Sequence, residues 1–197
     1  MNYDSETALV VVDVQNDFAD PSGSLYVTGG EEVVSPINAE IDRALSAGAT
    51  IVYTQDWHPE ETPHFQKFGG VWPVHCVRDT WGAELHPNLK VQGEVVRKGS
   101  GGEDGYSGFT VRDPRGGAES DTALESMLKK QGIKRIVVAG LATDYCVKET
   151  AIDGNARGFE TVVLVNATRA VDLEPGDGER ALEEIEGAGA RLESTTR

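Results

Sequence analysis

Residues 7–14 read TALVVVDV, and this run decides the fold class. Its β-branched side chains favour an extended strand, and the near absence of alternating polar residues indicates that both faces of the strand are buried. Further apolar runs alternate with amphipathic segments along the rest of the chain. This alternation is typical of parallel sheets covered by helices on both sides. We therefore expect one doubly wound domain over residues 1–197, with three α/β/α layers and a mainly parallel sheet of about six strands.

The other elements follow from the same patterns. After the first strand, we expect strands at residues 50–55, 95–97, 133–139, 161–165 and 190–193. The expected helices begin near capping residues and end near glycines. They cover residues 35–46 with Ser35 as the N-cap, a segment from Ser120 or Asp121 to 131, a segment from Thr143 to 157, and residues 178–186.

The composition excludes several classes of function. With 18 basic and 33 acidic residues, the chain has a formal net charge of −15, so we expect no nucleic-acid partner. No stretch approaches the roughly 18 apolar residues of a membrane span, and no leader-like segment precedes the first strand. Because there are only two cysteines, we expect the protein in the cytoplasm.

Reactive side chains follow several of the expected strands. Asp13 lies near the end of the first strand, Asp56 follows the second, Lys98 the third and Cys146 the fourth. In open α/β sheets, ligands bind at the carboxyl ends of the strands. These side chains are therefore expected at one edge of the sheet.

Three of these residues suit covalent catalysis. Cys146 is expected in the first turn of a helix, where unpaired N–H groups lower a thiol pKa, although it could be a buried apolar side chain. Asp13 stands in an apolar strand, where a carboxylate must be paired or functional, and beside a thiol it could act as a base. The cation of Lys98 would hold both groups in their charged forms, unless it is a solvated lysine at a strand end.

A possible metal site lies in the long irregular segment that follows the second strand. Asp56, His58, His64 and His75 are close together in the sequence, and their side chains suit zinc, iron or manganese better than calcium or magnesium. Asp56 and His58 are two residues apart, so an extended segment points both the same way. The alternative is a surface loop with scattered histidines. We expect the metal-binding loop to cover about residues 56–93.

Two further residues of this loop are given no catalytic role. His86 belongs to no motif and is expected on the surface. Cys76 directly follows a candidate ligand and is expected to be structural or a bystander. A disulfide between Cys76 and Cys146 would block the nucleophile and is not expected in a reducing compartment.

Five motifs occur in a fixed order and cover nearly the whole chain: LVVVDVQNDF, QDWHPEETPHF, GGVWPVHCV, RKG…YSGF and GLATDYCV. Together they resemble the nicotinamidase branch of the isochorismatase-like hydrolases. The resemblance implies that Asp13, Lys98 and Cys146 form a catalytic triad. It also implies a cis peptide bond before Ala142, with the N–H groups of Ala142 and Cys146 forming an oxyanion hole.

The same resemblance implies the remaining site residues. Phe18, Trp72 and Tyr106 would surround the substrate. Asp56, His58 and His75 would hold one divalent ion per chain, with zinc expected and iron or manganese as alternatives. His64 is the ligand on which relatives differ.

The implied function is a metal-dependent cysteine amidohydrolase that converts nicotinamide to nicotinate and ammonia through a thioester, and that would also accept pyrazinamide. One alternative is a related amidohydrolase for carbamoyl or ureido substrates, which generally lacks the metal loop. Another is a non-catalytic metal-binding or thiol-redox protein. A homo-oligomer is possible, and the sequence does not decide it.

Overall fold

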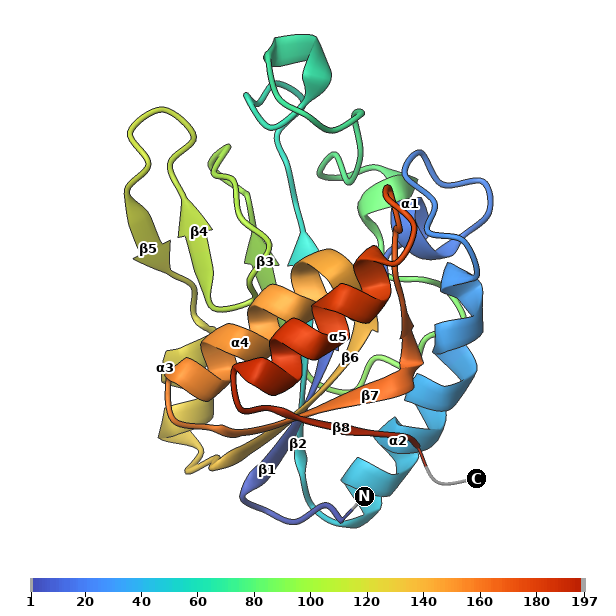
Figure 1. Ribbon diagram of the computed structural model, residues 1–197, viewed down its shortest axis with the longest axis vertical. Helices are drawn as coiled ribbons and strands as arrows, with labels where there is room; N and C mark the ends of the chain where they lie inside the picture. The colour runs from blue at the N-terminus through green and yellow to red at the C-terminus, as the bar shows by residue number, and fades with distance from the viewer. Residues whose placement is uncertain (1, 196–197) are drawn as a thin grey trace.

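A six-stranded parallel sheet forms the centre of the computed structural model, which describes residues 2–195 (Figure 1). The expected fold class is therefore confirmed. Met1, Thr196 and Arg197, which the expected domain boundaries included, lie outside the described residues. In chain order the strands of this sheet are β1 (Thr7–Val12), β2 (Thr50–Asp56), β3 (Glu94–Lys98), β6 (Arg135–Leu141), β7 (Glu160–Arg169) and β8 (Arg191–Glu193).

The order of the strands places the site. They lie in the order β3-β2-β1-β6-β7-β8, so the chain builds the sheet outward from β1 in one direction and then from β6 in the other. The reversal between β1 and β6 leaves a crevice at their carboxyl ends, which is where doubly wound folds bind ligands. Asp13, Asp56, Lys98 and Cys146 all lie at this edge because each ends or follows a strand of the parallel sheet.

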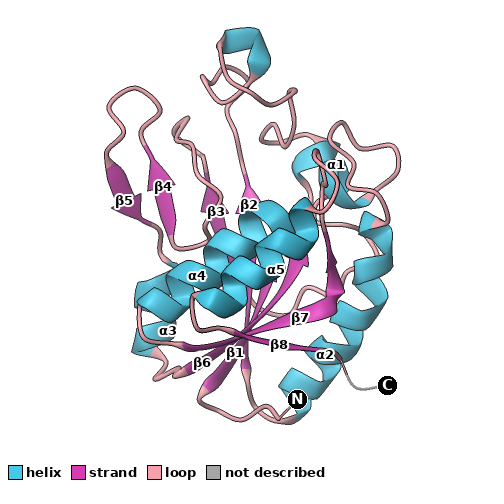
Figure 2. Ribbon diagram, in the orientation of Figure 1, coloured by secondary structure: helices cyan, strands magenta, loops and turns pink. Residues whose placement is uncertain are grey.

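Helices cover both faces of the sheet, and β1 divides its side chains between them. Leu9 and Val11 pack with α2 (Val34–Ser46) in one apolar cluster. Ala8, Val10 and Val12 pack in a second cluster on the opposite face. That face is covered by α3 (Leu124–Lys130), α4 (Lys148–Ala156) and α5 (Asp177–Gly187) (Figures 1 and 2). Burial on both faces explains why this run has no polar alternation.

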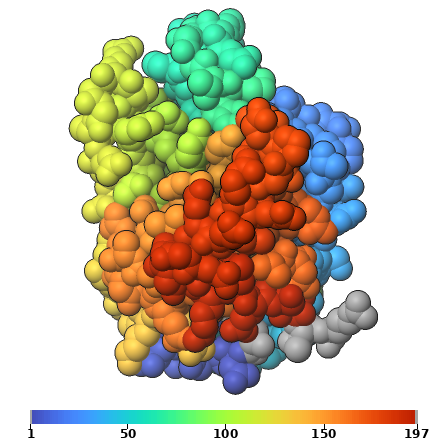
Figure 3. Space-filling model, in the orientation of Figure 1, coloured from blue at the N-terminus to red at the C-terminus, as the bar shows by residue number. Residues whose placement is uncertain are grey.

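The irregular segment between β2 and β3 extends beyond the carboxyl ends of the strands. It contains only two short 3₁₀ turns, Gln66–Phe68 and Trp81–Ala83. In the space-filling view part of it protrudes at the top of the molecule, beside the segment that follows β3 (Figure 3). That neighbouring segment contains an antiparallel hairpin of β4 (Thr110–Arg112) and β5 (Glu119–Asp121).

Several expected strand boundaries are wrong. β1 ends at Val12, because Asp13 adopts a left-handed conformation (φ 47°) that turns the chain out of the strand. β6 begins and ends two residues later than expected, since the N–H of Ile133 closes the turn after α3 by bonding the carbonyl of Leu128. β7 extends to Arg169, whereas the expected strand covered only residues 161–165, and its pairing with β6 is irregular near Gly140.

The helix starts also differ from the sequence-based expectations. The helix expected from residue 35 begins at Val34 as a continuation of a 3₁₀ turn, so Ser35 lies inside it and is not its N-cap. Ser120 and Asp121 belong to β5, which three exposed residues form without a recognisable pattern. The first turn of α3 is instead supported by Thr122, whose Oγ1 accepts the Leu124 N–H at 3.1 Å.

A short helix, α1 (Asn16–Ala19), was not expected from the sequence and follows β1 at the crevice. No helix in the described part of the chain has the length and apolar character needed to cross a membrane.

Candidate active site

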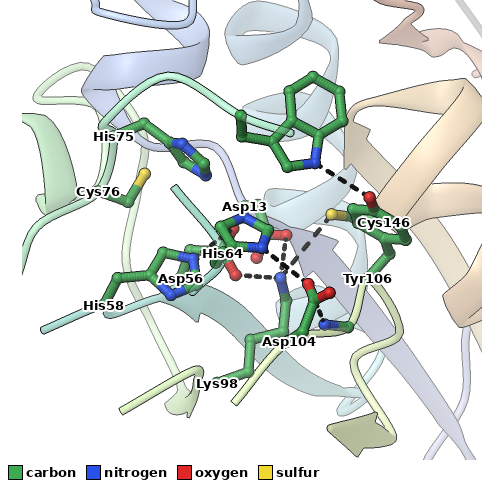
Figure 4. A network of polar contacts seen from close by, with 12 residues as sticks. Asp13, Asp56, His58, His64, His75, Cys76, Lys98, Asp104, Tyr106 and Cys146 are labelled. Carbon is green, nitrogen blue, oxygen red and sulfur yellow. Dashed lines mark hydrogen bonds and ion pairs between the residues drawn. The ribbon is translucent and has the colours of Figure 1, made fainter. Parts of the chain in front are cut away.

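The ammonium of Lys98 lies at the centre of the site, at the end of β3 (Figure 4). Its Nζ is 2.9 Å from Oδ2 of Asp13 and 3.7 Å from Sγ of Cys146, and it also forms an ion pair with Asp56. All four side chains are buried. Burial acts to lower the pKa of Lys98, but the two carboxylates outweigh it and hold that pKa well above its usual range. The lysine is therefore a permanent buried cation.

Asp13 is held where β1 ends. Its Oδ1 accepts a 2.6 Å hydrogen bond from the Thr54 hydroxyl, and its backbone N–H bonds the Thr54 carbonyl at 3.3 Å. Burial raises the pKa of Asp13, and the attraction of Lys98 only partly offsets this effect. A carboxylate with a raised pKa is a stronger base than one in water, so this residue is suited to take a proton.

Cys146 lies beside this pair. Its Sγ and one oxygen from each of Asp13 and Asp56 are all within 4.8 Å of one another. The expectation of a lowered thiol pKa is wrong: burial raises the pKa of Cys146 well above its usual range, Lys98 opposes the rise, and both carboxylates add to it. The thiol is therefore protonated until a base removes its proton.

The backbone around Cys146 explains part of this difference. Residues Thr143–Val147 form a π-helical turn, and α4 begins only at Lys148, so Cys146 is not in the first turn of an α-helix. The N-cap of this turn is Ala142 and not Thr143, whose hydroxyl instead hydrogen-bonds that of Thr168 at 2.8 Å. The peptide bond between Leu141 and Ala142 is cis, as the resemblance implied.

Gly140 allows β6 to approach β1 before this turn. Its φ of 124° lies in a region that side chains disfavour, and a Cβ there would stand 2.1 Å from the Val12 carbonyl oxygen. Ala142 and Cys146, the residues expected to form the oxyanion hole, both line the pocket above the buried ion pairs.

Three imidazoles converge next to Asp56. His58, His64 and His75 are buried, and one nitrogen from each lies within 4.8 Å of the others. Nε2 of His58 is also 3.8 Å from Oδ2 of Asp56. The structure thus brings together all four residues that the sequence suggested as metal ligands (Figure 4).

The chemistry of this cluster suits a divalent ion. Both ring nitrogens of His58 are buried and have no hydrogen-bond partner among the described residues, which would be costly without a further ligand. His75 donates from Nδ1 to the Pro73 carbonyl at 2.7 Å, leaving Nε2 free. Burial lowers the pKa of His75 to about 4, so its ring is neutral, the form that binds metals.

Local backbone features hold these side chains in place. The loop doubles back on itself, so that the His58 N–H bonds the Cys76 carbonyl at 3.0 Å. Gly99 packs directly on the His58 ring, since a Cβ at this position (φ 75°) would lie 2.6 Å from ring atoms. Gln15 joins β1 to Asp56 through two bonds to the backbone of Asp56, at 2.7 and 2.8 Å. No role for Gln15 was expected from the sequence.

A pocket opens above the cluster and the thiol, and most of the side chains that line it are apolar or aromatic, as in other small-molecule sites. Phe18, Trp72 and Tyr106, the expected substrate contacts, all line it. Tyr145 also lines it and was missed, although it directly precedes Cys146 in the motif. Its ring packs edge-on against Trp72, with ring centroids 4.9 Å apart.

The two loop residues without an assigned role lie elsewhere. His86 is buried, so the expectation of a surface position is wrong: its backbone N–H bonds the Val14 carbonyl at 2.9 Å, which attaches this part of the loop to the chain after β1. It is not part of the metal cluster. Cys76 is fully buried, and burial raises its pKa well above the usual range. Both cysteines are free thiols.

Comparisons with known proteins agree with this arrangement. The Isochorismatase domain family matches residues 7–197. The chain is 36% identical to the nicotinamidase of Escherichia coli, over 94% of this chain and 93% of that protein. The structure of the Pyrococcus horikoshii pyrazinamidase in complex with zinc is 39% identical, covers 96% of this chain and 99% of its own, and superposes with a TM-score of 0.85. An L. infantum protein in complex with nicotinate is 37% identical over 98% of this chain and 96% of its own, with a TM-score of 0.87.

Proposed function

The chain belongs to the isochorismatase domain family, and on this premise we propose that it is a cysteine amidohydrolase that converts nicotinamide to nicotinate and ammonia. One observation carries the proposal. A single buried ammonium, that of Lys98, contacts Asp13, Asp56 and Cys146 at the base of an aromatic pocket whose wall also contains Asp56, His64 and His75, three of the proposed metal ligands. A nucleophile, a base and a site for the substrate ring thus lie together.

Asp13 begins the reaction by taking the proton of Cys146. The raised pKa of this carboxyl makes it able to accept that proton, and the sulfur then attacks the carboxamide carbon. Lys98 stabilises the thiolate as it forms, because its Nζ is 3.7 Å from Sγ and remains charged. Because burial raises the pKa of the thiol, a neighbouring base helps to form the thiolate.

The oxyanion formed by this attack would be held by the N–H groups of Ala142 and Cys146. When the tetrahedral intermediate collapses, the C–N bond breaks and Asp13 returns its proton to the leaving nitrogen, which departs as ammonia. Water then attacks the thioester, with Asp13 taking one of its protons, and the C–S bond breaks. Nicotinate leaves and the thiol of Cys146 recovers its proton.

The metal-binding residues would act on the ring of the substrate. Asp56, His58, His64 and His75 would hold a divalent ion, which when bound supplies a Lewis acid for the pyridine nitrogen and so orients the carboxamide toward Cys146. Zinc is the expected ion, since imidazoles with one carboxylate suit it and the P. horikoshii relative was solved with zinc. Iron and manganese are the alternatives.

The walls of the pocket would select a flat aromatic ring. Phe18, Trp72 and Tyr106 are the proposed contacts, and Tyr145 completes the aromatic side of the pocket. Pyrazinamide, which has the same shape and also a ring nitrogen, should be accepted too.

The organisation of the chain fits one catalytic unit. We propose that residues 1–197 form a single domain, since both apolar clusters pack on the two faces of the same sheet, with the metal-binding loop in about residues 56–93. Because a thiol nucleophile must stay reduced, the cytoplasm is the proposed compartment.

Release of ammonia by the purified, zinc-loaded chain tests the function. Nicotinamide should be hydrolysed, and an N-carbamoyl amino acid, the substrate type of the rival amidohydrolases, should not. The cluster of His58, His64 and His75 disfavours the rival. Hydrolysis of the carbamoyl compound without hydrolysis of nicotinamide would establish the rival. Turnover of neither amide would favour a non-catalytic metal-binding protein.

A further inference from the structure

His64 has one ring nitrogen committed to a partner outside the metal cluster. Its Nδ1 is 2.7 Å from Oδ1 of Asp104, a residue that no motif singled out (Figure 4). An ionised carboxylate only accepts hydrogen bonds, so this contact requires the proton of the neutral ring to be on Nδ1. Nε2 of His64 is then left with a free lone pair.

That free nitrogen belongs to the cluster of three histidines. The rings of His64 and His58 are stacked with centroids 4.6 Å apart, and the His75 ring lies 5.2 Å from that of His64. His75 is held in the same way, because its Nδ1 donates to the Pro73 carbonyl. Two of the three rings thus have Nδ1 occupied and Nε2 available.

Asp104 is itself held firmly. Its Oδ1 also accepts the N–H of Gly105 at 2.8 Å, and its Oδ2 lies 3.5 Å from the guanidinium of Arg112. Its backbone exchanges hydrogen bonds of 2.7 and 2.6 Å with the backbone of Arg112, at the end of β4. These contacts hold the carboxylate in position independently of His64. Little conformational entropy is therefore lost in ordering it when an ion binds.

We propose that Asp104 is a positioning residue for the metal site, holding His64 with Nε2 available so that this histidine coordinates the ion together with Asp56, His58 and His75. A histidine that binds a metal commonly donates its other N–H to a carboxylate, which fixes the tautomer and the ring orientation. The inference rests on the metal site of the proposed function and not on the identity of the substrate. The contact between Asp104 and His64 also joins the proposed ligands to the segment that carries Tyr106, a residue of the pocket wall.

A purely structural role makes a different prediction. If the contact served only to attach the loop to β4, its loss would lower the melting temperature and leave the affinity for the ion unchanged. If Asp104 acts through His64, its loss should weaken the affinity, and only while His64 is present.

The test measures the dissociation constants of the full-length, metal-stripped protein for Zn²⁺ and Co²⁺ by competition with a chromophoric chelator. Asp104→Ala should weaken binding by about 10- to 100-fold. Asp104→Asn keeps a hydrogen-bond acceptor but removes the charge, so it should lose less affinity for the ion than Asp104→Ala. Glu103→Gln is the matched control, because it removes a charge from the adjacent residue, whose carboxylate bonds only the nearby Gly101 N–H in the structure, and should leave both constants within about twofold.

A double-mutant cycle separates the two roles. In the His64→Ala background, Asp104→Ala should cause no further loss of affinity, and the visible spectrum of bound Co²⁺ should be the same with and without Asp104. Melting curves of the metal-free variants check that each one folds. Native affinity in Asp104→Ala, or an equal loss in the His64→Ala background, would overturn the inference while leaving the metal site intact. A native chain that bound neither ion would remove the metal site, and this inference with it.

Discussion

The ammonium of Lys98 forms an ion pair with the carboxylate of Asp56, and both groups are buried. Because the same ammonium pairs with Asp13, one lysine belongs both to the proposed catalytic triad and to the proposed metal site. Burial acts to raise the pKa of Asp56, but the attraction of Lys98, together with smaller contributions, outweighs it and lowers that pKa, so this carboxylate stays ionised. The two groups of residues that are separate in the sequence are therefore one electrostatic unit.

Replacing the nucleophile should abolish the reaction without disturbing the rest of the site. We expect Cys146→Ala to have no measurable release of ammonia, with native melting behaviour and native metal content by elemental analysis. In the native protein, iodoacetamide should modify Cys146 before Cys76, because Cys146 lines the pocket whereas Cys76 is fully buried. Residual activity of a tenth in the alanine variant would refute the thioester mechanism.

Replacing the base should slow the chemical step. Asp13→Asn keeps the size of the side chain but cannot take the thiol proton, so kcat should fall by about 10²-fold or more, with a smaller change in KM. Asp42→Asn, which alters an exposed acid paired with Lys90, is the control and should be neutral. A native kcat in Asp13→Asn would assign the proton transfer to another group.

Removing the central cation should raise the pKa of the nucleophile. Lys98 lowers the pKa of Cys146 against the effect of burial, so Lys98→Met should move the pH profile of iodoacetamide alkylation to higher pH. Lys90→Met, which removes an exposed lysine, should leave the profile unchanged. Alkylation rates measured across pH, together with a melting curve for each variant, check this. An unshifted profile in Lys98→Met would mean that the cation does not influence the thiol.

A methyl group at Gly99 should disturb the metal site directly. Gly99→Ala would place a Cβ 2.6 Å from the His58 ring, so the affinity for Zn²⁺ should fall. Gly132→Ala is the matched control: its φ of 72° is close to the 75° of Gly99, but no atom lies within 4 Å of the added Cβ. Both variants should lose about 1–2 kcal/mol of stability from the left-handed conformation. Equal Zn²⁺ affinity in the two variants would contradict a role for Gly99 in seating His58.

The ring nitrogen of the substrate should matter through the metal. Benzamide has the size of nicotinamide and the same scissile amide, but it lacks the pyridine nitrogen. It should therefore have a much lower kcat/KM in the zinc-loaded protein, since a site built for one polar contact penalises a ligand that cannot make it. Chelation or His58→Ala should reduce turnover of nicotinamide sharply and that of benzamide little. Equal kcat/KM values for the two amides would remove the metal from substrate recognition.

The sequence by itself determined the fold class and the edge of the sheet where the chemistry occurs. A run such as residues 7–14 is stable only when both faces are covered, and the carboxyl ends of parallel strands share one edge. Asp13, Asp56, Lys98 and Cys146 each end or follow a strand, so these two facts place them at the same edge. Patterns that extend over a few residues were sufficient for both conclusions.

The tertiary structure decided the relations between side chains that are far apart in the chain. The thiol of Cys146 is raised in pKa because its surroundings come from other strands, a burial that the local helix pattern does not reveal. Asp104 reaches His64 across forty positions of sequence, and only the folded loop brings them together. His86 is buried for the same reason. Local periodicity reports which face of an element is covered, whereas hydrogen bonds and charge pairs across loops depend on the full path of the chain.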